Sequence, residues 1–431
     1  MLPLLLSCTT PPPQHTAGPH LILISLDTVR ADHLGVYGYD QPTSPRLDAF
    51  AETADIFTSA TAAAPWTLPS HAAMFTGLLP AMHGAVTDTP QEAGGSGGDA
   101  LALSDAHITL AETLAAAGYQ TAGFVANGGY LSEAYNLHQG FARYTVQSGP
   151  GVRLNAQVAG WLDTEARTDR PLFLFLNYMD AHRPYNTAPL PGWPAPEDPD
   201  VLGPLNALIA QVMIRGEPPD PTLRATVMGH YDHGIANADA AVGGLLDLLA
   251  ARGLLAGATV VITADHGEAF GEHGLVEHGV DVYEALVHVP LLIHHPGQTA
   301  RRDRDQRVGS ANLPGLLAPG LPPLADMPVP KTVVAANRYS RPKDRHHGGR
   351  FMRTREAVYD GSLKLILSSD GDDALLDLSA DPGEVRDLLA DRPEDAARLR
   401  ALKPVAAPLS EGTVAPSAEI EAALRALGYV E

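Results

Sequence analysis

Uninterrupted apolar runs of strand length recur along the chain, and a polar residue follows closely after each. They occupy residues 21–26, 172–176, 259–263 and 289–293, and residues 120–125 are strand-like as well. Short apolar runs without alternation are typical of strands that are buried on both faces of a parallel sheet. The pattern therefore predicts strands that are far apart in the sequence and buried in one sheet.

Helices are predicted between these runs. Ser44 precedes Pro45 as an N-cap followed by proline at the first helical position, and Gly118 and Gly253 end later helices. The expected helices span roughly residues 45–54, 68–76, 108–117, 155–167 and 235–251. Strands that alternate with helices predict an α/β fold with a mainly parallel sheet.

A long proline-rich stretch, residues 184–221, shows neither a helix nor a strand pattern. Irregular connections of this length are usually lids or binding loops. Because the stretch follows His182 directly, we expect it to form part of the substrate pocket wall rather than a linker between domains.

The pattern changes after about residue 300. Residues 331–335 are short and apolar, and residues 341–355 are basic and loop-like. Residues 358–367 and 374–378 alternate like a small antiparallel hairpin, and residues 381–384 turn into a last helix. We therefore expect a leader and tether over residues 1–19, a catalytic domain over 20–330, and a small sheet with a helical tail over 331–431.

Composition narrows the range of partners. The 431 residues carry a formal net charge of −21, with a sequence pI of about 5.2. Nucleic-acid-binding domains normally present a basic face, so no nucleic-acid partner is expected. An anionic substrate is compatible with this charge, because exposed charges are screened beyond roughly 8 to 10 Å and local cations decide what a pocket binds.

The first residues resemble the end of a bacterial lipoprotein signal, with the small Ser7 before Cys8 as the lipidated residue. Residues 9–19, with three consecutive prolines, would then be a tether. Cys8 is the only cysteine, so no intrachain disulfide forms. No later run approaches the roughly 20 apolar residues of a membrane span. We expect a protein of the bacterial cell envelope, periplasmic or held at the membrane through an N-terminal lipid anchor.

Polar residues just past the predicted strands are the first indication of a site. They are Asp27, Asn127, His182, Asp265 and His266. In parallel sheets ligands bind beyond the carboxyl ends of the strands. These side chains, far apart in sequence, are therefore expected at one rim of one sheet.

Asp27, Asp265 and His266 form an oxygen-rich ligand set for one divalent cation, which the hydroxyl of Thr67 would complete. The set does not choose among calcium, manganese, magnesium and zinc. A bound metal lowers the pKa of water from 15.7 to about 7, and by the same logic makes a Thr hydroxyl a competent nucleophile.

Thr67 is expected as the N-cap of its helix, where free backbone N–H groups suit an anion. His71 lies one turn further along, at the spacing that shares a helix face. His182 and His278 are candidates for contacts to the substrate oxygens and for protonating the leaving oxygen.

Several motifs resemble the sulfatase family, within the alkaline phosphatase superfamily, and they run in family order over nearly the whole chain after residue 19. The matching stretches are residues 26–35, 67–71 with 76–77, 182–185, 264–268, 271–274 with 278–279 and 283–284, 376–378 with 381–384, and 427–429.

The resemblance implies an alkaline-phosphatase-like sandwich, in which a large, mainly parallel sheet is flanked by helices and followed by a small C-terminal β subdomain. It also implies one divalent ion, with calcium as the usual ion of the family. The site residues are then the metal ligands Asp27, Thr67, Asp265 and His266 and the catalytic residues Thr67, His71, His182 and His278.

The chain departs from the family pattern at the site. Ordinary sulfatases carry Cys or Ser, oxidised to formylglycine, where Thr67 stands, and Arg where His71 stands. Oxidation of Thr would give a ketone because its β-carbon carries a methyl group, so the aldehyde-hydrate mechanism is excluded and sulfate is placed in doubt. Thr28 replaces a second acidic ligand, and residues 126–130 lack the family's lysine-and-histidine motif.

The sequence therefore predicts a metal-dependent hydrolase of sulfate or phosphate esters with Thr67 as nucleophile. Its partner would be a sulfated or phosphorylated glycan, lipid or small molecule. One alternative is a transferase similar to phosphoethanolamine and phosphoglycerol transferases, which also use a Thr nucleophile on one metal. Another is a non-catalytic binding protein on the same scaffold.

Overall fold

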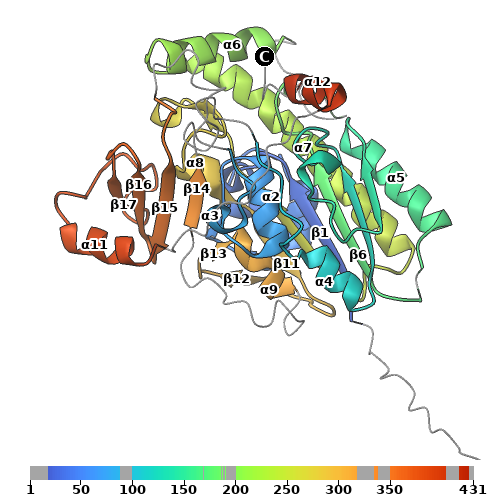
Figure 1. Ribbon diagram of the computed structural model, residues 1–431. Coiled ribbons are helices and arrows are strands. Elements are labelled where there is room, and N and C mark those ends of the chain that lie inside the picture. The colour runs from blue at the N-terminus through green and yellow to red at the C-terminus, as the bar shows by residue number, and fades with distance from the viewer. Residues whose placement is uncertain are drawn as a thin grey trace, which may run out of the picture.

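An eight-stranded sheet forms the centre of the molecule in the computed structural model (Figure 1). The structure describes residues 18–87, 100–167, 169–185, 187, 190, 200–317, 334–337, 350–403 and 417–426. The predicted leader up to residue 17 and most of the basic loop over 341–355 lie outside these ranges, so the lipid anchor stays a prediction.

The central sheet is mainly parallel, as predicted. Its strands, in spatial order, are β12 (Arg302–Arg304), β2 (Asp55–Phe57), β11 (Leu291–His294), β7 (Ala258–Ala264), β1 (His20–Leu26), β6 (Leu172–Tyr178), β4 (Gln120–Val125) and β5 (Arg143–Val146). Among these described strands, only β11 is antiparallel to its neighbours. The apolar runs at 21–26, 120–125, 172–176 and 259–263 are thus confirmed as buried parallel strands.

The run at 289–293 is two strands rather than one. Pro290 separates β10 (His288–Val289) from β11, and β10 pairs in a second sheet with β3 (Ala60–Thr61). β13 (Val308–Gly309) completes that three-stranded sheet. Proline has no N–H for a ladder hydrogen bond, so the chain passes from one sheet to the other at this residue.

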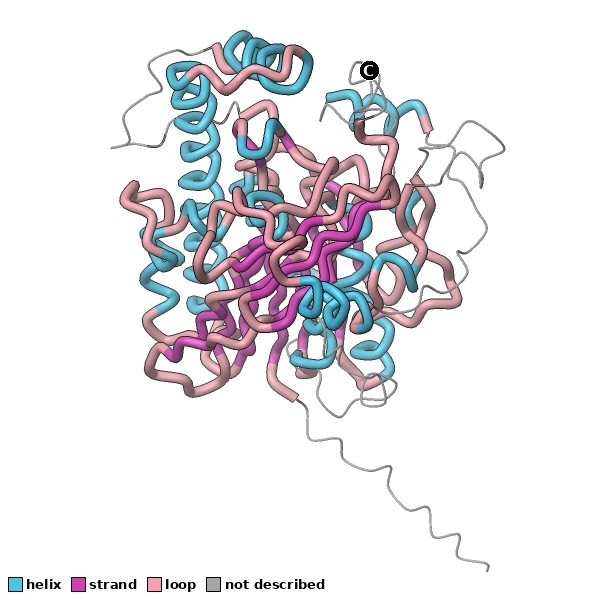
Figure 2. Tube along the Cα trace, turned by 90° about the vertical axis from the view of Figure 1, so that its left-hand side faces the viewer, coloured by secondary structure: helices cyan, strands magenta, loops and turns pink. Residues whose placement is uncertain are grey.

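Helices cover both faces of the central sheet (Figure 2). α7 packs with α1, α5 and α6, whereas α2 packs with α3, α4 and α9. The main-domain helices are α1 (Pro45–Ala51), α2 (Thr67–Thr76), α3 (Pro80–His83), α4 (Leu110–Ala116), α5 (Gly151–Thr164), α6 (Leu202–Ile209), α7 (Pro221–Ala251), α8 (Glu284–Val287) and α9 (Leu313–Leu317). Short 3₁₀ turns η1 (Ala31–His33), η2 (Gly35–Tyr37), η3 (Glu133–Tyr135), η5 (Glu272–Gly274) and η6 (Ser310–Asn312) connect them.

Of two predicted helix starts, the start of α1 was confirmed and the start of α7 was wrong. Ser44 is the N-cap residue of α1 and Pro45 is its first residue, as predicted. The Ser44 hydroxyl makes no capping hydrogen bond, because it donates to Asp48 Oδ1 and accepts from the N–H of Gly35. α7 begins at Pro221 rather than at Ile235. The carboxylate of Asp220 accepts two backbone N–H groups of its first turn, which is an N-cap that precedes a proline at the first helical position.

The proline-rich stretch is also more regular than predicted. Residues 202–209 form α6, and a π-helical turn η4 (Ala210–Ile214) continues it. Four of their apolar side chains, those of Leu205, Leu208, Val212 and Met213, are buried in the main core. Helix α7, on which α6 packs, is long and apolar enough by length and composition to cross a membrane, which the sequence prediction denied. Because 61% of its most apolar stretch is buried inside the structure, α7 serves here as the core helix.

The C-terminal sheet has four antiparallel strands, not a single hairpin. They are β14 (Val334–Asn337), β15 (Arg355–Asp360), β16 (Leu363–Ser368) and β17 (Ala374–Asp377). The predicted element over 358–367 turns at Gly361, whose φ of 61° suits glycine. Two helices follow instead of one, α11 (Pro393–Ala401) on β15 and β16, and α12 (Ala418–Ala426). α12 returns to the main domain, where Leu424 is buried.

A buried ionic cluster joins the two parts of the fold. Lys364 of β16 donates from Nζ to Glu284 Oε1 at 2.9 Å and to Glu384 Oε1 at 2.6 Å. The hydroxyl of Tyr359 donates to the same oxygen of Glu284, the first residue of α8. We call these four residues the Lys364 cluster. Its lysine is fully buried, so the charges have little water to solvate them.

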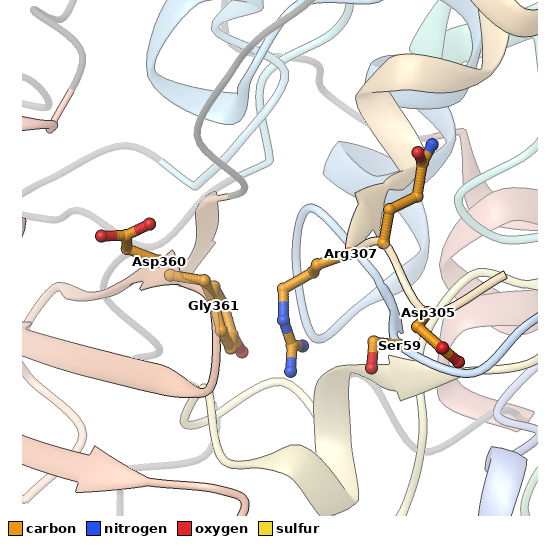
Figure 3. A pocket seen from close by; sticks show the side chains of 7 residues that line it. Ser59, Asp305, Arg307, Asp360 and Gly361 are labelled. Carbon is orange, nitrogen blue, oxygen red and sulfur yellow. The ribbon is translucent and has the colours of Figure 1, made fainter.

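A pocket of about 310 Å³ lies at the same junction (Figure 3). Arg307 extends across it, lying over the ring of Tyr359 at 4.4 Å and donating to Thr61 Oγ1. The other lining residues are Ser59, Asp305, Gln306, Asp360 and Gly361. None of these lining residues follows the strand ends at which a site is expected.

We predict that Lys364→Met lowers the free energy of unfolding by about 3 to 5 kcal/mol, because two buried carboxylates lose their ammonium partner. Lys403→Met is the matched control, since Lys403 pairs with Glu356 at the surface and is 40% exposed. Its loss should cost less than about 1 kcal/mol. Denaturant titration followed by circular dichroism measures both values, and an equal loss in the two variants would contradict the role of the Lys364 cluster.

Candidate metal centre and active site

Two neighbouring strands of the central sheet deliver the candidate metal ligands. Asp27 follows β1, and Asp265 and His266 follow β7. The parallel register pairs Leu26 with Ala264, so the residues after them meet at the carboxyl ends. All three side chains are fully buried, and one ligand atom from each lies within 4.8 Å of the others. The structure therefore brings the predicted ligands together.

Two asparagines hold the Asp27 carboxylate. Asn127, which follows β4, donates from Nδ2 to Asp27 Oδ2 at 3.2 Å. Asn177, within β6, donates to the same oxygen at 3.3 Å. Neutral donors orient the carboxylate without cancelling its charge, so Oδ1 stays directed to the interior of the cluster.

Backbone groups hold the other two ligands. Asp265 Oδ1 accepts the N–H of Thr28 at 3.2 Å and that of His266 at 2.9 Å. His266 Nδ1 lies 2.9 Å from the carbonyl oxygen of Gly267, which can only accept, so Nδ1 carries the proton. His266 Nε2 is then a lone-pair donor, as a metal ligand must be.

Three buried ligand atoms have no hydrogen-bond partner among the residues that the structure describes: Asp27 Oδ1, Asp265 Oδ2 and His266 Nε2. Nε2 lies 3.4 Å from Asp265 Oδ2 and 3.8 Å from Asp27 Oδ1. Buried polar atoms without a partner are rare, and three such acceptors around one point fit a divalent cation. The donor set thus has the geometry and the chemistry of a metal centre.

The charges of the site lead to the same conclusion. Burial and, to a smaller extent, the nearby Asp265 carboxylate together raise the pKa of Asp27 to about 6. Burial also raises the pKa of Asp265, to about 7, although backbone N–H groups oppose this shift. Burial lowers the pKa of His266 to about 4. The imidazole is therefore neutral, and the two carboxylates need a cation in order to ionise together.

Thr67 lies directly beside these ligands. Its Oγ1 accepts from Asn127 Nδ2 at 3.4 Å, and the proximity of its side chain lowers the pKa of Asp265. The prediction that Thr67 is the N-cap was wrong by one residue. Trp66 is the N-cap, with extended backbone, and Thr67 is the first helical residue of α2. The hydroxyl is still at the helix end whose N–H groups have no acceptor within the helix.

His71 lies on the inner side of α2, with both ring nitrogens in hydrogen-bond contact. Nδ1 donates to the carbonyl oxygen of Thr67 at 2.9 Å, and Nε2 lies 3.0 Å from Ser25 Oγ on β1. Burial lowers its pKa to about 3, so the ring is neutral. Through these two contacts, His71 connects the first turn of α2 to β1.

His182 and His278 lie next to the ligand cluster. The His278 ring is 4.4 Å from that of His266 and 5.1 Å from that of His182, measured between ring centroids. His182 comes from the loop after β6 and His278 from the loop after β9 (Val276–Glu277), which pairs with β8 (Ala269–Phe270). All sequence-predicted site residues are therefore brought to one end of the sheet.

Glycine allows α7 to approach the loop that carries His182. A β-carbon on Gly234 would lie 2.5 Å from the carbonyl oxygen of Asp180 and 2.7 Å from Cα of Ala181. Only glycine fits at this distance, so the position of His182 depends on a residue of the core helix.

Thr28 does not take the place of the missing acidic ligand. Its hydroxyl donates to the carbonyl oxygen of Asp27 at 2.7 Å, and its φ of 64° is in the left-handed region. Tyr231 donates to the carbonyl oxygen of Thr28 and accepts the N–H of Arg30, which fixes this turn.

Sequence reasoning misses the roles of four residues that build the site. Asn127 is predicted at a strand end without a role, and Asn177, Tyr185 and Glu268 receive none either. A polar residue near the end of an otherwise apolar run, as at Asn177, is the available signal. Nothing in the sequence indicates that Glu268 and Tyr185 contact each other.

The pKa shifts generate a prediction for the metal-free protein. A carboxyl group with a raised pKa stabilises the fold below its unfolded pKa, near 4, and this stabilisation is lost as pH rises through its folded pKa. Between pH 5 and pH 8 in chelator, the melting temperature of the native protein should therefore fall relative to that of Asp265→Asn. Thermal denaturation at intervals of one pH unit measures this, and a constant difference between the two would contradict the shift.

The chain is similar in sequence to known proteins. The sulfatase family model matches residues 19–318. The ulvan-active sulfatase of Formosa agariphila is 26% identical over 309 residues, which cover 65% of this chain and 56% of that protein. The chain thus spans little more than half the length of this relative.

Two solved structures share the fold. The structure of BT4656 in complex with its substrate, D-glucosamine-2-N,6-O-disulfate, has a TM-score of 0.67 and 17% identity, covering 95% of this chain and 98% of that one. The phosphonate monoester hydrolase of Agrobacterium radiobacter has a TM-score of 0.62 and 18% identity, covering 89% and 94%. The predicted fold class is confirmed. Because the family model covers well over half of its residues, the chain belongs to the sulfatase family.

Proposed function

We propose that this protein is a metal-dependent hydrolase of sulfate or phosphate esters that uses Thr67 as its nucleophile. The observation that carries the proposal is the position of the Thr67 hydroxyl. It lies at the N-terminal end of a buried helix, beside three ligand atoms that have no hydrogen-bond partner within the described residues. A hydroxyl in this setting is oriented and close to the place where a cation would be held.

The relatives support an anionic ester as substrate. BT4656 has a sulfated glucosamine as its substrate, and the Agrobacterium protein is a phosphonate monoester hydrolase. Sulfate esters, phosphate esters and phosphonates share a tetrahedral anionic group. Thr67 cannot form the aldehyde of ordinary sulfatases, which favours a direct attack by the hydroxyl.

The metal would be held by Asp27 Oδ1, Asp265 Oδ2, His266 Nε2 and the Thr67 oxygen. When bound, it supplies positive charge that lowers the pKa of the hydroxyl and neutralises the transferred group. The family resemblance alone implies calcium, which prefers six to eight oxygen ligands. An imidazole nitrogen with three oxygens favours zinc or manganese, and we propose one of these two ions.

Residues of the protein would then carry out the remaining steps of the reaction. Thr67 Oγ1 attacks the sulfur or phosphorus atom, and its proton passes to the neighbouring Asp265 carboxylate. The first turn of α2 offers backbone N–H groups such as that of Leu68 to the transferred group, whereas Pro69 has none. The ester oxygen leaves as an alcohol, and water later releases the group from Thr67.

His182 and His278 are proposed to protonate the leaving oxygen. A neutral ring cannot give a proton from Nε2, because its single proton is on Nδ1. An anionic group bound beside the rings favours the imidazolium form, which carries the second proton on Nε2. His71 is assigned a positioning role instead, since both of its nitrogens already have partners.

Substitution of the nucleophile tests the proposal. Thr67→Ala should lower turnover of the best aryl sulfate, phosphate or phosphonate by at least about 10³-fold while metal content stays unchanged, because only the hydroxyl is lost. Thr67→Ser should keep part of the activity, since the hydroxyl remains without the methyl group that restricts its rotamer. Full activity of Thr67→Ala would overturn the mechanism and favour a water nucleophile.

Mass spectrometry of native protein quenched during turnover distinguishes the alternatives. A hydrolase should show a phosphate or sulfate group on the peptide that contains Thr67 and should release free anion. A transferase should form the same adduct but label an added glycan or lipid acceptor instead. A binding protein should show no adduct with any substrate.

Metal content tests the ligand assignment separately from activity. We expect one zinc or manganese ion per chain by elemental analysis, and an affinity for calcium at least about tenfold weaker by titration calorimetry. Asp27→Ala and Asp265→Ala should each lose the ion while the circular dichroism spectrum is retained. Asp232→Ala, a buried carboxylate on α7, is the control and should keep the ion. Full occupancy in either ligand variant counts against the site.

A further inference from the structure

Glu268 is a buried carboxylate next to the active site that is not one of the three grouped metal ligands. Its Oε1 lies 3.0 Å from His278 Nδ1, and its Oε2 accepts a hydrogen bond from the hydroxyl of Tyr185 at 2.8 Å. Both oxygens are therefore occupied by groups of the protein. The arrangement is a Tyr–carboxylate–His chain that ends at a histidine beside the metal ligands.

These Tyr–carboxylate–His contacts fix the proton on one nitrogen of His278. When the Glu268 carboxyl is ionised it can only accept, and the proton of the neutral imidazole is then on Nδ1. Nε2 is then the nitrogen that can act toward the substrate. The ring contacts those of His266 and His182, so a rotated ring would disturb both.

Tyr185 holds the carboxylate from the other side. It is fully buried, with a φ of 57°, and its N–H donates to the carbonyl oxygen of His182. Its ring packs at 6.0 Å from that of Tyr231 and 6.2 Å from that of Phe270. Tyr185 thus connects the loop that carries His182 to Glu268.

The nearby ionic groups have partners of their own. Glu277 pairs with Arg183, and Arg30 donates to Asp32, Glu272 and the backbone oxygen of Glu268. Neither arginine reaches the Glu268 carboxylate in these contacts. The Glu268 carboxylate is therefore oriented by its contacts with His278 and Tyr185.

We propose that Glu268 and Tyr185 are positioning residues, which together fix the tautomer and the ring orientation with which His278 meets the leaving oxygen. The role of His278 toward substrate rests on the proposed function. The tautomer and the orientation do not, because they follow from contacts within the protein.

A second set of Tyr–carboxylate–His contacts, elsewhere in the protein, provides an internal control. His33 Nδ1 lies 2.8 Å from Asp232 Oδ1, and Tyr39 donates to Asp232 Oδ2 at 2.7 Å. This trio is built from η1, α7 and the loop after η2, and it contains none of the candidate site residues. Asp232→Asn therefore makes the same chemical change as Glu268→Gln at a place that should not affect the reaction.

The first experiment is independent of catalysis. Two-bond ¹H–¹⁵N correlation spectra of metal-loaded protein with labelled histidine report the protonated nitrogen of each ring. His278 should show the Nδ1–H form, and Glu268→Gln should shift it towards the Nε2–H form. Asp232→Asn should alter His33 and leave His278 unchanged. An unchanged His278 in Glu268→Gln overturns the proposal even if no substrate is ever found.

The second experiment measures coupling between the residues. Glu268→Gln should lower kcat by about 10- to 100-fold with metal content and KM nearly unchanged, and Tyr185→Phe should act in the same direction with a smaller effect. In a His278→Ala background, Glu268→Gln should cost nothing further. The loss should also be larger for esters of alkyl alcohols than for nitrophenyl esters, whose leaving oxygen needs no proton.

The outcomes separate the two proposals. If Thr67→Ala is inactive but Glu268→Gln costs the same with and without His278, the positioning role is wrong and the proposed function stands. If Thr67→Ala is active while His278 changes its tautomer in Glu268→Gln, the positioning holds and the nucleophile is wrong.

Discussion

Two carboxylates are buried side by side without a lysine or arginine partner among the described residues, and the site depends on this constraint. Asp27 and Asp265 are both fully buried, and burial of an unpaired charge is costly. Their outer oxygens receive amide and backbone N–H groups, which orient them but add no positive charge. A lysine or arginine in place of the asparagines would fill the space of the cation. The neutral donors therefore leave the negative charge of the two carboxylates uncompensated within the described residues.

Much of this arrangement could be predicted from the sequence, because parallel strands place their carboxyl ends together. The apolar runs that form β1 and β7 are enough to place Asp27, Asp265 and His266 at one edge of the sheet. Contacts between loops could not be predicted in the same way. Glu268 contacts Tyr185 only because the loops after β6 and β7 fold against each other. No periodic pattern of the sequence indicates this contact.

Local signals failed where a tertiary contact overrides them. The apolar run over 289–293 predicts one strand, but Pro290 divides it between two sheets. Ser44 is the N-cap residue of α1, as its sequence predicts, yet its hydroxyl bonds to Asp48 and Gly35 rather than to the first turn of the helix. The start of α7 has its own signal in Asp220 and Pro221, which the surrounding prolines obscure.

The motifs shared with the sulfatase family serve the scaffold as well as the reaction. Glu284 and Glu384 belong to two of these motifs, and both contact Lys364, far from the metal ligands along the chain. Separating the small sheet from the large one would break the ion pair between Lys364 and Glu284. The two sheets should consequently melt in a single cooperative transition, and an expression fragment cut near residue 330 would lose the C-terminal side chains that form a hydrophobic cluster with Ala63, Ala73, Leu79 and Ala311.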